Sequence, residues 1–157
     1  MESHSQLIKN EVMSFFREKR IPFESDVDPK KIFYTVTLEN FGDIDCEIKF
    51  EDNGYVFLAY FKDKISLFSS RKKNAILEFI TRLNYRYAFG TFVYFNNTGK
   101  VGFQCGDYCG DDLPNMDNFD YQFVFIVRRI YSFDKCVEAI ANSNTTVDEA
   151  LKLEIEL

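Results

Sequence analysis

The feature that most constrains this chain is a strict alternation of apolar and charged residues between positions 44 and 51. Ile44, Cys46, Ile48 and Phe50 are apolar, and an acidic or basic residue follows each of them. Side chains of a β-strand point alternately to its two faces, so this pattern predicts a strand with one buried face and one face in water. Such a strand is typical of an antiparallel sheet that is covered on one side.

Two further strands are predicted next to this one. Residues 34–38 precede it and alternate in the same way. Asn53 and Gly54 follow it, and this pair favours the left-handed backbone of a tight hairpin turn. The next residues, 55–61, are apolar on both faces. We therefore expect residues 55–61 to form a central strand or to contact a partner.

Apolar residues at helical spacing occur on both sides of these strands. Residues 5–20 have the pattern of an amphipathic helix, which ends before Pro22. A second helix, which Ser69 or Ser70 can cap, has a stripe of five apolar residues: Ile76, Phe79, Ile80, Leu83 and Tyr87.

The region after residue 115 has two interpretations. Residues 121–127 alternate as a strand would, but apolar residues keep helical spacing from Met116 to Ile140, and this length favours one long helix. Asn115 or Asp117 would begin it. Three residues widen its apolar face: Tyr121, Val124 and Phe125. We expect such a helix to be deeply buried or shared with another subunit.

The stretch LNYRYAFGTF, residues 83–92, joins the second helix to a strand at residues 91–95. Gly90 is expected where the helix end needs a positive φ. Asn84 is expected to hydrogen-bond nearby backbone groups, a structural role that we favour over ligand binding. A turn at residues 96–100 leads into a returning strand, and Thr146 with Glu149 predicts a capped final helix.

These elements predict one α+β domain over residues 1–157. The predicted order is α-β-β-β-α-β-β-α-α, an antiparallel sheet with helices packed on it. The length fits a single domain, and the sequence has no Pro-rich or Ser-rich linker.

Charge and composition argue against several classes of function. The net charge of −6 opposes binding to nucleic acid and to anionic membranes. No apolar run approaches the roughly 18 residues of a membrane-spanning helix, and the first residues do not resemble a secretion signal. We therefore expect a cytoplasmic protein whose four cysteines are free thiols.

The residues that usually support catalysis are scarce. A cysteine nucleophile normally needs a neighbouring base, most often histidine. The only histidine is His4, in an end of the chain that we expect to be frayed. We therefore expect neither enzymatic activity nor a cofactor.

Residues 105–120 form an Asp-rich loop that supplies candidate metal ligands. Two thiols and five carboxylates lie in it: Cys105, Cys109, Asp107, Asp111, Asp112, Asp117 and Asp120. Carboxylates suit calcium, but the spacing of a calcium loop is absent. A zinc site from Cys105, Cys109, Cys136 and His4 is unconvincing. We expect no bound metal and keep a small-molecule or metal-responsive sensor as an alternative function.

Aromatic residues at 55–61 and 92–95 leave an RNA-binding interpretation open. Sheets of this kind can stack bases, provided that cations lie nearby. Five basic residues are available: Lys62, Lys64, Arg71, Lys72 and Lys73. The net acidity and the helix order argue against this interpretation, so we expect no nucleic-acid partner.

Two short marks resemble the YbjN-like family of bacterial proteins, whose fold is similar to that of type III secretion chaperones. One is the junction pattern of Leu83, Asn84, Tyr87, Gly90 and Phe92. The other is the end of the long helix, Ala139 and Ile140, followed by Glu149 and Ala150. The family usually carries a proline near Thr146, which this chain lacks.

The resemblance implies a non-enzymatic protein-binding module, either chaperone-like or a regulatory adaptor. Some family members are described as candidate regulators of sensory transduction. The chaperones of similar fold are dimers that bind extended segments of other proteins. We therefore expect a homodimer with another protein as partner. The apolar surplus of the sequence suggests six contact residues: Tyr55, Phe57, Phe61, Tyr121, Val124 and Phe125.

Overall fold

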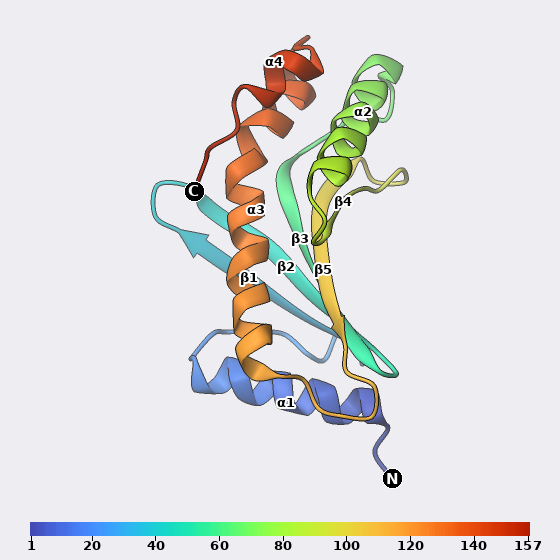
Figure 1. The fold of residues 1–157 in the computed structure, drawn as a ribbon, viewed down its shortest axis with the longest axis vertical. Helices are drawn as coiled ribbons and strands as arrows, with labels where there is room; N and C mark the ends of the chain where they lie inside the picture. Colours follow the sequence, from blue (N-terminus) through green and yellow to red (C-terminus); the bar gives the residue numbers. More distant parts are fainter.

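A computed structural model describes the whole chain, residues 1–157. The elements follow in this order: α1 (His4–Glu18), β1 (Lys31–Leu38), β2 (Gly42–Glu51), β3 (Gly54–Lys64), α2 (Ser70–Arg86), β4 (Thr91–Tyr94), β5 (Lys100–Tyr108), α3 (Met116–Asn142) and α4 (Val147–Leu151). This is the predicted order, and residues 121–127 belong to the long helix α3 (Figure 1).

The five strands form one antiparallel sheet in the order β1-β2-β3-β5-β4. Strand β3 has a partner on each side, so residues 55–61 lie in a central strand, one of the two alternatives that the sequence left open. Strand β2 shows the predicted alternation, since Ile44 and Ile48 are buried whereas Asp45 and Lys49 are exposed. Strands β1 and β4 are the two edges of the sheet.

The helices lie on one face of the sheet. Tyr34, Ala59 and Phe92 belong to one row that crosses the sheet on this face. Phe16 of α1 packs on Tyr34 with 4.9 Å between ring centroids, and Phe133 of α3 packs on Phe92 at 5.3 Å. Figure 1 shows α3 running across the sheet, α1 at one end, and α2 with α4 at the other. We call the opposite side of the sheet the open face.

Phenylalanine dominates the core. The fully buried large side chains include Phe16, Phe50, Phe57, Phe79, Phe92, Phe103, Phe119 and Phe133. Tyr55, Phe57 and Phe61 are only 2%, 0% and 4% exposed, and the first two pack on Phe119 of α3. The structure corrects the expectation that these three side chains reach a partner, because the helices already cover them.

The stretch from 83 to 92 is a fixed corner. Helix α2 ends at Arg86, and Tyr87 already has an extended backbone with φ −112°. Gly90 has the expected positive φ, +77°, but it lies just before β4 and not at the helix end. The Asn84 amide donates to the Phe92 carbonyl at 2.9 Å and accepts from the Phe92 N–H at 2.7 Å. These two bonds confirm the structural role predicted for Asn84.

Side-chain caps begin the helices as predicted. The Ser69 and Asn115 side chains each accept a hydrogen bond from the backbone N–H three residues later. Thr146 and Glu149 form the complete capping box. His4 is the first residue of α1, so the end that we expected to be frayed is helical. No helix has both the length and the apolar character needed to cross a membrane.

Asp134 of α3 is a half-buried carboxyl with one oxygen that has no hydrogen-bond partner. Burial raises its pKa, and Asp63 and Glu138 add to this effect while Lys62 opposes it. A raised pKa means that the ionised carboxylate destabilises the folded state at neutral pH. Protonation therefore stabilises the fold as the pH falls through the folded-state pKa.

We expect Asp134→Asn to raise the free energy of unfolding at pH 7, by at most about 1 kcal/mol because solvent screens a half-buried group. The gain should shrink as the pH falls through the folded-state pKa and vanish only well below about pH 4, the ordinary pKa of an aspartate, where the carboxyl is protonated in both states. Urea unfolding of both proteins across this pH range measures it. Asp52→Asn, at an exposed turn residue, is the control for the removal of one negative charge. If the gain in stability did not change with pH, it could not be due to the removal of an ionised carboxylate.

Candidate functional site

The Asp-rich loop has a structural task and no preformed metal site. Asp107 accepts a hydrogen bond from the Asn118 side chain at 2.7 Å, which ties the end of β5 to the start of α3. Asp111 and Asp112 are exposed. No group of three or more His, Cys, Asp or Glu side chains is arranged to hold a metal ion. Nothing in this loop therefore supports the sensor alternative.

The thiols are poor nucleophiles. Burial raises the pKa of Cys46, Cys105 and Cys136 to about 12 in each case. Cys109 is half-buried, and its pKa is raised by burial and by the carboxylates of Asp107 and Asp112. The thiolate is the reactive form, so these cysteines stay protonated and unreactive near neutral pH.

The aromatic strands give little support to base stacking. Phe57, Phe61 and Phe92 are buried beneath the helices. Tyr60 is half-exposed on the open face, but its hydroxyl donates to the Glu47 carboxylate at 3.3 Å. A carboxylate beside the ring repels a phosphate backbone, which weakens the RNA-binding interpretation further.

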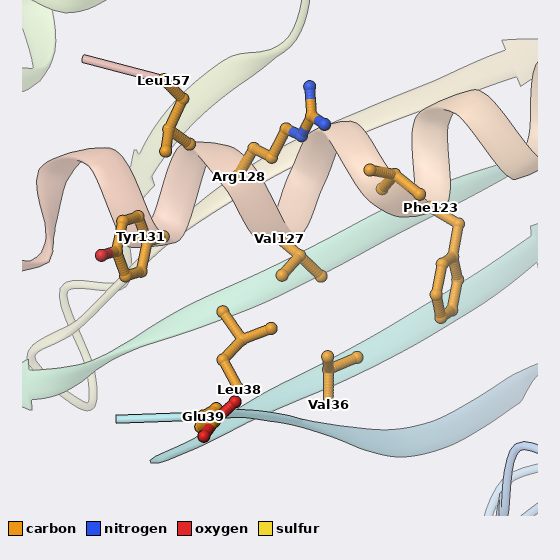
Figure 2. A pocket seen from close by; sticks show the side chains of 9 residues that line it. Val36, Leu38, Glu39, Phe123, Val127, Arg128, Tyr131 and Leu157 are labelled. Atoms are coloured by element: carbon orange, nitrogen blue, oxygen red, sulfur yellow. The ribbon is translucent and has the colours of Figure 1, made fainter. Parts of the chain in front are cut away.

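An apolar groove lies between helix α3 and the edge strand β1. Seven of its nine lining residues are hydrophobic, and the cavity volume is about 660 Å³. The lining residues are Val36, Leu38, Glu39, Phe123, Val124, Val127, Arg128, Tyr131 and Leu157. Figure 2 shows Val127 of α3 pointing toward Leu38 and Val36 of β1. We call this feature the α3–β1 groove.

The groove exists because the cover over β1 is incomplete. Ile32 and Tyr34 are 0% and 5% exposed, and Tyr34 stacks on Phe123 with 5.4 Å between ring centroids. Val36 and Leu38 lie on the same side of the strand but are only half-buried. Helix α3 therefore closes the groove at Phe123 and leaves it open toward the end of β1.

The neighbouring edge of β1 has free hydrogen-bonding groups. Glu24 pairs with Phe33 through two backbone bonds of 2.8 and 2.9 Å, which covers the first part of the edge. Backbone groups of a strand point alternately to its two sides, so those of Thr35 and Thr37 also point outward. No backbone partner meets them. An unpaired edge beside an apolar groove can accept another strand.

Acidic side chains flank this edge on the open face. The hydroxyls of Thr35 and Thr37 donate to the carboxylates of Asp45 and Asp43 at 3.2 and 2.6 Å. Glu39 lies at the rim of the groove. A segment next to the edge would thus meet apolar residues and Glu39 on the groove side, and the carboxylates of Asp43 and Asp45 on the open face.

The remaining predicted contact residues occupy different sides of α3. Val124 is 44% exposed and lines the groove. Tyr121 is 62% exposed and stacks on Phe125, which packs in turn on Phe89 and Phe103. The structure therefore brings Val124 alone of the six predicted residues into the groove.

Sequence reasoning missed most of the groove. Its lining includes Val36, Leu38, Val127, Tyr131 and Leu157. Val36 and Leu38 have the pattern of an ordinary half-buried strand, and only the position of β1 at the sheet edge uncovers them. The alternation of apolar and polar residues predicted strand β1, but it did not predict that β1 lies at the edge of the sheet.

Comparison with solved structures identifies the fold. No family model and no curated protein matches the chain. A chain in the crystal structure of the ExsC–ExsE complex is similar over 85% of this chain and 95% of its own length, with a TM-score of 0.58 and 11% identity. YbjN, a candidate transcription regulator from E. coli, is similar over 83% and 89%, with a TM-score of 0.57 and 12% identity. This chain has the fold of YbjN and of the type III secretion chaperones, which confirms the fold that the sequence predicted.

Proposed function

We propose that this protein is a non-enzymatic binding module, chaperone-like or adaptor-like, which holds an extended segment of a partner protein in the α3–β1 groove. The observation that carries the proposal is the apolar groove beside the unpaired backbone of Thr35 and Thr37. The similar chain in the ExsC–ExsE complex gives support, since that structure contains a second protein. The proposal includes a homodimer, as the resemblance implies, and the cytoplasmic location that the sequence led us to expect.

The proposed mode of binding sets the chemistry of the partner segment. An added strand would hydrogen-bond to the backbone of Thr35 and Thr37, which supplies affinity without sequence selectivity. Every second side chain would enter the groove beside Val36 and Leu38, where burial of apolar area stabilises the complex. The intervening side chains would lie near Asp43 and Asp45, which favour lysine or arginine. The expected partner segment alternates apolar and basic residues.

Val124→Asp is expected to weaken binding of a short fluorescein-labelled peptide that alternates valine and lysine. The new carboxylate would be buried against apolar side chains in the complex, which should raise the Kd at least about tenfold. Fluorescence anisotropy measures the Kd, circular dichroism checks the fold, and light scattering on the same samples is expected to give a dimer mass. Val124 is 44% exposed, so the variant should fold.

Tyr121→Asp is the matched control, because Tyr121 is on the same helix but does not line the groove. Its Kd should stay within about twofold of the wild type, a small change in binding free energy. A peptide that alternates valine and glutamate should bind more weakly to the wild type. Equal affinities for the Val124→Asp and Tyr121→Asp proteins would place the binding site elsewhere.

A further inference from the structure

The residues after α4 run back along helix α3 toward the groove. Figure 1 shows the C-terminal end beside α3, close to the turn between β1 and β2. Residues 154–157 have no regular secondary structure. Within them, the Ile155 N–H donates to the Ser132 carbonyl of α3 at 2.9 Å. This bond places the tail on the surface of α3.

Glu154 is the main anchor of this tail. Its two carboxylate oxygens accept hydrogen bonds from the Arg86 guanidinium at 2.7 and 3.2 Å. The Tyr87 hydroxyl donates to the same carboxylate at 3.0 Å. Two-pronged pairs of arginine and carboxylate are among the stronger polar contacts, and the Glu154 side chain is only 15% exposed. The end of helix α2 therefore holds the tail in place.

Leu157 brings the tail to the groove. Its side chain is part of the groove lining, near Tyr131 and Arg128 (Figure 2). It is nevertheless 71% exposed, so its contact with the groove removes little apolar area from water. No hydrogen bond is formed by Glu156 or Leu157. The end of the tail is thus weakly attached, whereas Glu154 is firmly attached.

We propose that residues 154–157 form a strap that restricts entry to the α3–β1 groove and moves aside when a partner segment binds. This inference rests on the proposed function of the groove. The pairing of Glu154 with Arg86 and Tyr87 keeps the strap closed in the free protein. The apparent affinity of a binding site falls in proportion to the fraction of molecules in the open state. Loosening the anchor therefore raises affinity without changing the groove.

The test compares Glu154→Ala with Glu156→Ala. Both changes remove one negative charge from the tail, but Glu156 makes no hydrogen bond and is exposed. Hydrogen exchange measured by mass spectrometry reports attachment of residues 152–157, and anisotropy with the valine–lysine peptide reports affinity. For Glu154→Ala we expect faster exchange of the tail and a Kd about threefold to tenfold lower than for Glu156→Ala.

A second variant distinguishes a strap that moves aside from a fixed part of the binding site. Leu157→Ala should lower the Kd if Leu157 obstructs the groove, whereas a higher Kd would show that Leu157 is a wall of the site and would overturn the strap. The strap would also be overturned if hydrogen exchange of the tail were unchanged in Glu154→Ala, or if exchange were faster but the Kd were unchanged. Both results would leave the groove intact as a binding site. Failure of every protein to bind the peptide would instead remove the proposed function and the strap with it.

Discussion

Phe133→Ala is expected to lower the free energy of unfolding by about 3–5 kcal/mol, as for other large side chains removed from a packed core. Phe133 is completely buried, and its ring packs edge-on against Phe79, Tyr87 and Phe92 at centroid distances of 6.2, 6.0 and 5.3 Å. These residues come from α2, from the corner after it and from β4. The cavity would thus remove the contact that joins helices α2 and α3 to the edge strand β4.

Urea unfolding followed by far-ultraviolet circular dichroism measures this loss. A domain of this size should also lose roughly 10 °C in Tm, since each kcal/mol lowers it by about 2–4 °C. Phe68→Ala is the control, because Phe68 is fully exposed and its removal should cost almost nothing. Similar losses in the two variants would contradict the packing of α3 on β4.

Gly90→Ala is expected to cost about 3 kcal/mol, from two causes. Its φ of +77° disfavours any residue with a Cβ by about 1–2 kcal/mol. A Cβ at this position would also collide with the ring of Phe103 and lie 3.0 Å from the Gln104 carbonyl oxygen. The Phe103 ring is completely buried and cannot move aside freely, so overpacking adds about 1–3 kcal/mol.

Gly110→Ala is the matched comparison for this corner. Gly110 also has a positive φ, +62°, but a Cβ there meets only Tyr108, at 3.7 Å. The loss of stability in Gly110→Ala should therefore be limited to the backbone cost of about 1–2 kcal/mol. Denaturant unfolding of the two variants measures the difference. Equal losses would show that the Phe103 ring accommodates the added methyl group.

Local patterns in the sequence were sufficient for most of the fold. The alternation around Ile44 and Ile48 predicted a half-buried strand, and Asn53 with Gly54 predicted a turn after it. The turn is present, but its two residues are Asp52 and Asn53, and neither Asn53 nor Gly54 has the positive φ that the sequence predicted. The helical spacing across residues 121–127 correctly outweighed their alternation, because a continuous apolar face of this length suits a helix. Each of these features depends on residues close together in the chain.

The features that the sequence did not predict depend on contacts between residues far apart in the chain. The sequence left residues 55–61 as a central strand or as a partner contact, and the pairing of β3 with both β2 and β5 shows that they form a central strand. The groove requires α3 to cross the sheet without covering Val36 and Leu38. The end of α2 was also misplaced, because Asn84 fixes the corner through Phe92, eight residues later in the chain.

Amide exchange at the edge of β1, followed by NMR, tests the central claim most directly. The backbone N–H groups of Thr35 and Thr37 have no partner in the free protein and should exchange rapidly. Addition of the valine–lysine peptide should slow their exchange at least about tenfold, since an added strand would bond to them. Strand β4 is the other edge of the sheet and should be unaffected. Protection of β4 instead, or none at Thr35 and Thr37 when the peptide is bound, would contradict strand addition in the α3–β1 groove.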